Sequence, residues 1–321
     1  MKTIILNLIL FLISVSVSLG QKNDQQFYYP ASHNWVFSEK YPDINRLLNS
    51  FDYGHAILYE ELYNNPDNIK EVLETEIYNK LVNDILKNGP DMNMPEESIA
   101  PNYSKLAWNA MNMFDWAHKL HRQSYDILAD DNIKDKETEM KKVLDYYLSN
   151  EKLAFIPVAK SMDFMDKQYY SKVFREKFPK YNGLVWAYHY LQIALYDALI
   201  KEEKSERENA IKEVYNNFWN YLKNPPESLP QEMPMTMEFS PEFSKKYPEY
   251  RIIFDNLHMM HDVISDILAN EFVKDKSIEI ELAIQRVNDK NFMIAKPDEH
   301  NHNSDKNKKE NKEDNHEKHN H

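Results

Sequence analysis

Apolar residues recur at alternating three- and four-residue spacing along much of the chain, which is the pattern of α-helices that bury one face. Residues 102–130 show this spacing most clearly. The stripe there runs through Ala107, Met111, Phe114, His118, His121, Tyr125 and Leu128. Comparable stripes pass through His55, His189 and His258. The pattern therefore predicts four long helices, each with a histidine on its apolar face.

A second, more charged helix is expected after each histidine helix, over residues 68–87, 136–150, 206–223 and 277–288. Turn-forming stretches such as Asn88-Gly89-Pro90 separate the predicted helices. A further helical segment is expected near residues 157–174. The chain has only 4 glycines but 21 tyrosines and 15 phenylalanines, which suits an aromatic helical interior. Together these features predict an all-α fold of four tandem helix hairpins.

A six-residue motif, F-x-[EK]-K-[YF]-P, occurs at residues 37–42, 174–179 and 243–248. Each copy precedes a histidine helix, and its proline suits the first helical turn, where its missing N–H is not needed. Internal repetition at this scale can indicate a solenoid. A histidine at a similar place in every unit instead favours a closed helical bundle or array, because equivalent residues then share a centre.

The two ends of the chain differ in composition from the rest. Residues 1–20 combine an early lysine, an apolar run and small residues before a cleavage point, as in a signal peptide. Residues 297–321 are almost entirely Asn, Lys, Asp, Glu and His, which predicts a disordered histidine-rich tail. The repeat domain is then residues 21–296. We expect an exported protein, periplasmic, extracytoplasmic or secreted, with no integral membrane segment after signal cleavage.

Charge and cysteine content limit the function. The formal net charge is −13, so the chain lacks the basic surface that nucleic-acid binding requires. Cysteine is absent, so any metal must be held by His, Asp, Glu, Met or Tyr. The sequence indicates metal ions as partners and leaves any protein partner unidentified.

The pattern F-D-x-x-H-x-x-H-x4-D-I-L begins at Phe114 and again at Phe254. Two imidazoles three residues apart on one helix face can reach one metal ion or two adjacent ions. An aspartate three residues before the first histidine can bind the metal or orient the imidazole. The candidate ligands are His55, His118, His121, His189, His258, His261, Asp52, Asp115 and Asp255.

Histidine and carboxylate ligands suit a transition metal ion, namely copper, zinc or iron. Copper is slightly favoured because methionines cluster in two predicted loops, at Met92 and Met94 and at Met233, Met235 and Met237, where thioethers could be exposed. The primary hypothesis is a protein that binds or handles a transition metal.

Two other functions remain open. A metal-dependent oxidoreductase, either ferritin-like and di-iron or haem-containing, could use a helical bundle of this kind. Ferritin-like sites use E-x-x-H pairs, however, where this chain has D-x-x-H. Alternatively, the chain could be a helical-repeat interaction module whose histidines are structural. Whether the protein is an enzyme is left open by the sequence.

Overall fold

The computed structural model describes residues 28–65, 69–223 and 226–296. Within these residues helices dominate and no strand occurs, apart from one isolated bridge between Lys160 and Ile294. The predicted all-α class is therefore confirmed. The predicted signal peptide and the predicted histidine-rich tail lie outside the described residues.

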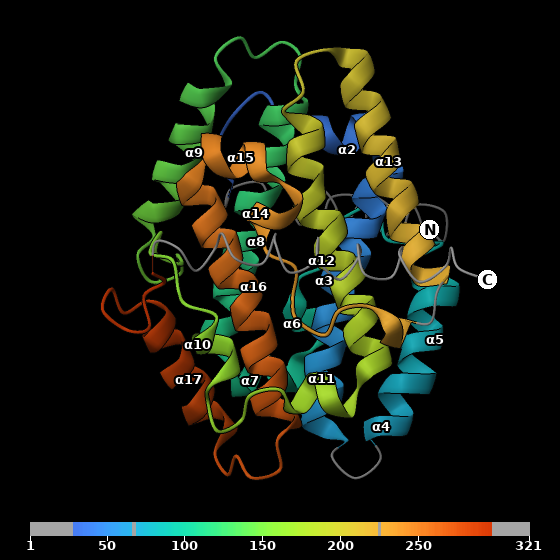
Figure 1. The fold of residues 1–321 in the computed structure, drawn as a ribbon, viewed down its shortest axis with the longest axis vertical. Helices are drawn as coiled ribbons and strands as arrows, with labels where there is room; N and C mark the ends of the chain where they lie inside the picture. Colours follow the sequence, from blue (N-terminus) through green and yellow to red (C-terminus); the bar gives the residue numbers. More distant parts are fainter. Residues whose placement is uncertain (1–27, 66–68, 224–225, 297–321) are drawn as a thin grey trace, which may run out of the picture.

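Four long helices occupy the centre of the molecule (Figure 1). They are α3 (Pro42–Asn64), α8 (Trp108–Ala129), α12 (Pro179–Leu199) and α16 (Pro248–Ala269). Helix α3 packs against α12 and α16, and α8 packs against the same two helices. All four apolar stripes thus face a common interior, because each helix has two of the others as neighbours.

A short helix precedes each long one and is separated from it by a single non-helical residue. The short helices are α2 (Val36–Lys40), α7 (Pro101–Leu106), α11 (Val173–Lys177) and α15 (Pro241–Lys246). The separating residues are Tyr41, Ala107, Phe178 and Tyr247, with φ between −134° and −127° and ψ between 50° and 64°. Three of them precede a proline, which disfavours the α conformation in the residue before it.

The expectation of one continuous helix over residues 102–130 is wrong, because the chain bends at Ala107. Ala107 has the same conformation as the three residues that precede prolines, although Trp108 follows it. The beginning of α7 is held from outside, since Glu60 of α3 accepts hydrogen bonds from the backbone N–H groups of Asn102 and Tyr103. This anchoring orients α7 independently of α8.

Each short helix has such an anchor. A buried or half-buried acid near the end of a neighbouring long helix accepts two of its first backbone N–H groups, which a helix cannot satisfy internally. The pairs are Glu60 with Asn102 and Tyr103, Asp126 with Trp35 and Phe37, Asp197 with Glu242 and Phe243, and Asp266 with Lys172 and Phe174. We call these four residues the capping acids. They join α3 to α7, α8 to α2, α12 to α15 and α16 to α11.

Charged helices flank the four central ones (Figure 1). The first runs through α4 (Ile69–Glu71), η1 (Val72–Ile77), α5 (Tyr78–Lys80) and η2 (Leu81–Ile85); the others are α9 (Lys136–Ser149), α13 (Lys204–Lys223) and α17 (Lys276–Val287). Short helices complete the fold: α6 (Glu96–Ile99), α10 (Asp163–Asp166), η3 (Pro226–Ser228) and α14 (Thr236–Phe239). Instead of one helix near residues 157–174, the chain forms α10 and the beginning of α11.

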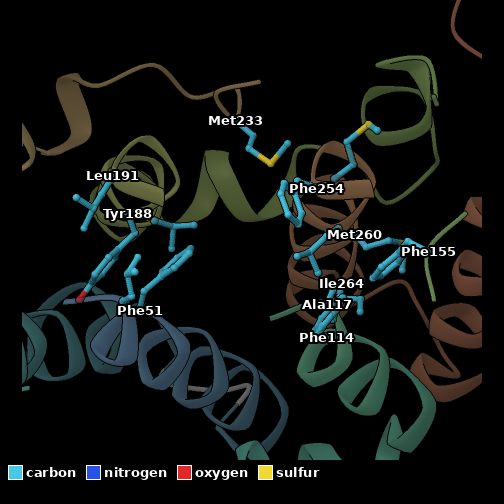
Figure 2. Packing of buried hydrophobic residues seen from close by; sticks show 14 of the residues in the cluster. Phe51, Phe114, Ala117, Phe155, Tyr188, Leu191, Met233, Phe254, Met260 and Ile264 are labelled. Atoms are coloured by element: carbon cyan, nitrogen blue, oxygen red, sulfur yellow. The ribbon is translucent and has the colours of Figure 1, made fainter. Parts of the chain in front are cut away.

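Aromatic side chains fill the interior between the central helices. Figure 2 shows Phe51 of α3 directed toward Tyr188 of α12, and their rings stack at a centroid distance of 4.8 Å. On the other side, Phe114 of α8 lies beside Ile264 of α16. Burying one such side chain stabilises the fold by roughly 1.5–3 kcal/mol. In the described part of the chain, no helix has the length and hydropathy that crossing a bilayer requires.

Candidate metal centre

Six histidines from the four central helices meet in the interior, and each is at most 2% exposed. They are His55, His118, His121, His189, His258 and His261. The ring centroids of His55 and His261 lie 4.2 Å apart, and those of His189 and His258 lie 4.6 Å apart. His118 contacts His261 at 5.7 Å, and His121 contacts His258 at 5.6 Å. The imidazoles form one continuous group, which we call the histidine cluster.

The four helices contribute to this centre from two matched positions. Asp52, His118, His189 and His258 each lie ten residues after the first residue of their helix. Three residues later, on the same helix face, lie His55, His121, Gln192 and His261. A partial copy of the motif, F-D-x-x-H, begins at Phe51 and predicts that His55 corresponds to His118, but the structure gives another alignment. His55 corresponds to His121 and His261, and Asp52 takes the place of the earlier histidine.

Three of the imidazoles are arranged as candidate ligands of one ion. One ring nitrogen from each of His55, His189 and His261 lies within 4.8 Å of the other two. Tetrahedral zinc with Zn–N bonds of 2.0–2.1 Å places its nitrogens roughly 3.3 Å apart. Side-chain shifts of about 1 Å would therefore close the three nitrogens around a metal ion. They come from α3, α12 and α16, so the site would tie three helices together.

Many ring nitrogens of the cluster have no hydrogen-bond partner among the described residues. They are Nδ1 and Nε2 of His55, both ring nitrogens of His118, Nε2 of His121, Nδ1 of His258 and Nε2 of His261. Leaving a buried polar atom unsatisfied costs about 1–3 kcal/mol. Buried histidines with a purely structural role are usually hydrogen-bonded, so these nitrogens suit a ligand. Their chemistry fits a metal ion.

No known protein family matches this chain, and no curated protein or solved structure matches it either.

Polar neighbours orient two of the remaining imidazoles. His121 Nδ1 lies 2.6 Å from the Tyr196 hydroxyl, which also contacts Ser124 Oγ at 3.0 Å. His258 Nε2 lies 2.7 Å from Gln192 Oε1. With the amide oriented in this way, Nε2 of His258 donates and its Nδ1 carries the lone pair. Contacts of this kind fix the tautomer and direction of metal-binding histidines.

The electrostatic surroundings keep these imidazoles neutral. Burial, followed by neighbouring histidines, lowers the pKa of His55, His121, His189 and His261 well below 6.5. Burial also lowers the pKa of His118, and that of His258 to about 3. Metal binding requires the neutral form, because the lone pair must be free of a proton. The centre therefore has its ligand atoms in the required state at neutral pH.

The three predicted aspartate ligands have different surroundings. Asp52 Oδ2 accepts a 2.5 Å hydrogen bond from Arg122, while Oδ1 lies 3.8 Å from His118 Nδ1. Asp115 belongs to a second group with His118 and Glu96, in which one candidate ligand atom from each lies within 4.8 Å of the others. Asp52 and Asp115 thus adjoin the histidine cluster through His118.

Asp255 has other contacts. Its Oδ1 accepts the Thr236 backbone N–H at 2.9 Å, at the beginning of α14, and its Oδ2 lies 3.6 Å from Arg251. These contacts give Asp255 a role in holding α14 against α16.

Sequence reasoning missed Glu96 and the pairing role of Gln192. Glu96 is 2% exposed and lies on a four-residue helix after a turn-rich stretch, where no helical periodicity marks it. Its pKa is raised well above the usual value by burial and by the nearby Asp115 and Asp52. A signal does exist in the chain: residues 96–101 and 236–241 both end in a proline that opens a short helix. Aligning them matches Glu96 with Thr236.

The methionine argument for copper is weakened by the structure. Met233 and Met235 are buried at 5% and 8% exposure, and Figure 2 shows the Met233 side chain packed between the helices that carry Leu191 and Phe254. Met111 Sδ accepts a hydrogen bond from Ser104. Met92 and Met94 are exposed, as expected of loop residues. Two of the five loop methionines, Met233 and Met235, therefore serve packing, whereas Met92 and Met94 are accessible.

A small cavity of about 10 Å³ opens beside the cluster. Its lining includes Asp52, His118, His121, Arg122 and Gln192. A cavity of this size holds about one water molecule. Its walls therefore carry side-chain atoms that can bind a metal ion, and the cavity has space for a small polar molecule such as water.

Proposed function

We propose that this protein binds a divalent transition metal ion at His55, His189 and His261. One observation carries the proposal: both ring nitrogens of His55 and Nε2 of His261 are buried and have no hydrogen-bond partner among the described residues, while His261 Nδ1 lies 3.5 Å from His189 Nε2. A metal ion would satisfy these lone pairs and repay the cost of burying them. Beside the three proposed ligands, His258 is held by Gln192 and His121 by Tyr196.

Three imidazoles suit zinc or copper(II) most directly, with iron as a further possibility for a mixed set that includes carboxylates. Burial of Met233 and Met235 weakens the preference for copper, and the exposed Met92 and Met94 remain compatible with it. A small ion suits the geometry better than haem, because the rings of His55 and His261 are only 4.2 Å apart. A porphyrin would have to separate the helices that carry them.

We further propose that the chain is a closed array of four related hairpin units. The four capping acids support this, since each lies eighteen residues after the first residue of its long helix. The same bend before each long helix supports it as well. In such an array, matched positions converge, and this accounts for one cluster drawn from four helices. Export of the protein remains a proposal that rests on residues 1–20.

The direct test is metal binding by the full chain after the tail histidines have been removed as competitors. Replacing His300, His302, His316, His319 and His321 with asparagine gives a parent protein, which we call the tail-substituted protein. It should bind one zinc or copper(II) ion tightly in calorimetric titration and retain it through desalting. His55→Ala, His189→Ala and His261→Ala should each weaken binding at least about 100-fold.

His33→Ala is the matched control, because His33 is buried at 3% exposure and belongs to neither candidate ligand group. It should bind metal like its parent. Equal affinity in parent and His261→Ala, with both proteins folded by circular dichroism, would reject the proposed site.

A further inference from the structure

A second group of ligand-type side chains lies beside the histidine cluster. It consists of Glu96 from α6 and of Asp115 and His118 from α8, with one candidate ligand atom from each within 4.8 Å of the others. His118 links the two places, because its ring lies 5.7 Å from that of His261. The group differs from the first in composition, having two carboxylates and one imidazole.

The carboxyl group of Glu96 is buried and forms no ion pair with a lysine or arginine among the described residues, although the charge of Lys119 partly opposes the rise in its pKa. Its Oε2 has no hydrogen-bond partner in the described part of the chain, and the side chain is 2% exposed. The closest base is His118, whose Nδ1 lies 3.6 Å from Glu96 Oε1, beyond hydrogen-bond length. Neither ring nitrogen of His118 has a partner among the residues described. Two buried side chains thus direct unsatisfied atoms into the same place.

Arg122, a basic residue beside this group, is bound by Asp52 at 2.5 Å. Glu96 and Asp115 lie beside the neutral imidazole of His118, and of these two acids Glu96 is the buried one. Buried carboxylates are normally paired with a cation or coordinate a metal. Two carboxylates and an imidazole are ligands that Fe²⁺ and Mn²⁺ accept readily.

The matched place on α16 provides an internal comparison. Asp115 and His118 correspond to Asp255 and His258, because both pairs lie seven and ten residues after the first residue of their helix. Glu96 corresponds there to Thr236, whose backbone N–H is bound by Asp255. Thr236 is fully buried, so this framework accommodates a threonine at that position. The glutamate is therefore not required by the packing of the framework.

We propose that Glu96, Asp115 and His118 bind a second, oxygen-preferring divalent cation such as Mn²⁺ or Fe²⁺. The protein would then hold two adjacent ions with unlike ligands. That the protein holds two ions rests on the proposed function, namely metal binding at the histidine site, whereas the second site can be tested alone. Asp52 acts as a positioning residue, held by Arg122 and facing His118.

The experiment uses the full-length tail-substituted protein, first given one equivalent of Zn²⁺ and then titrated with Mn²⁺. Electron paramagnetic resonance measures free Mn²⁺, because the sharp six-line signal of the hydrated ion is lost on binding. One Mn²⁺ per chain is expected to bind while the zinc is retained. Glu96→Thr, which copies the matched place on α16, and Asp115→Asn should each weaken Mn²⁺ binding at least about 10-fold and leave zinc binding unchanged.

The exposed neighbour Glu97 supplies the control, and Glu97→Gln should bind Mn²⁺ like the parent. Zinc binding without Mn²⁺ binding would overturn the second site and leave the first intact. Mn²⁺ binding that is equal in the parent and in a folded Glu96→Thr protein would overturn it too. Mn²⁺ binding that depends on Glu96 in a protein that binds no zinc would support the second site and reject the histidine site.

Discussion

The same four helices carry two sets of buried or half-buried polar side chains with opposite properties. The capping acids Glu60, Asp126, Asp197 and Asp266 each accept two backbone N–H groups, so their polar atoms serve the fold. The histidine cluster, one to three turns earlier along these helices, keeps several ring nitrogens without a partner among the described residues. Burial alone therefore does not mark a functional site. Several unsatisfied ring nitrogens gathered in one place do mark a candidate site, because leaving them unsatisfied has a cost that a bound ligand would offset.

The largest expected difference between the two sets is in metal-dependent stability. Zinc at 100 times its dissociation constant should raise the free energy of unfolding by about 2.7 kcal/mol. The tail-substituted protein and its Asp266→Ala variant should both show this gain in urea denaturation, and chelation should reverse it. His261→Ala should show none, because it removes a ligand. A full zinc effect in His261→Ala would place the metal elsewhere.

Loss of a capping acid should act on the metal-free fold. Asp266 is 2% exposed and accepts the N–H groups of Lys172 and Phe174 at 2.8 and 2.7 Å. Asp266→Ala leaves both donors without an acceptor and should cost about 2 kcal/mol of unfolding free energy. Asp275→Ala removes an exposed N-cap from α17 and should cost about 1 kcal/mol. An Asp266→Ala protein as stable as its parent would contradict the anchoring role.

The two sets should respond to pH with opposite signs. Burial lowers the pKa of His258 to about 3, so between pH 6.5 and 3 the unfolded chain binds the proton more tightly and acid destabilises the fold. Burial raises the pKa of Asp126 to about 7, despite two backbone donors that lower it. Between its unfolded value near 4 and pH 7 the folded chain holds the proton, so acid stabilises the fold.

Variants isolate these contributions in the metal-free tail-substituted protein. Between pH 7 and pH 5, His258→Gln should gain about 2 kcal/mol of stability relative to the parent, and Asp126→Asn should lose about 2 kcal/mol. Urea denaturation at the two pH values measures both differences. If the unfolding free energies of the two variants changed with the same sign relative to the parent, the two sets of side chains would not differ in their pH response as proposed.

The smallest effect is expected where a ligand position is made apolar. His55 lies between aromatic rings, 4.3 Å from Phe51 by ring centroids, and neither of its ring nitrogens has a partner in the described residues. His55→Leu removes the unsatisfied atoms while keeping most of the volume. The metal-free protein should therefore keep its stability to within about 1 kcal/mol, because relief of the polar cost offsets the altered packing. A loss above about 3 kcal/mol would indicate a structural histidine.

Helical periodicity was sufficient to predict the all-α class and the four central helices, because burial of one face imposes the three- and four-residue spacing. The histidines on those faces could be named for the same reason. The motif predicts the wrong register for His55. F-D-x-x-H occurs in both α3 and α8, but in α3 it begins three residues farther from the first residue of the helix. Glu96 could not be predicted because a four-residue helix shows no periodicity. The hydrogen bond of Asp255 to Thr236 could not be predicted either, because Thr236 lies in another segment.

X-ray absorption spectroscopy of the zinc-loaded tail-substituted protein tests the central claim most directly, because it reports the atoms bound to the metal. We expect at least three imidazole nitrogens at about 2.0–2.1 Å from zinc. One imidazole should be lost from the spectrum in His261→Ala loaded at high zinc, while the spectrum of His33→Ala should match that of the parent. Zinc bound mainly by oxygen, with a spectrum unchanged by His261→Ala, would contradict the proposal that His55, His189 and His261 form a metal site.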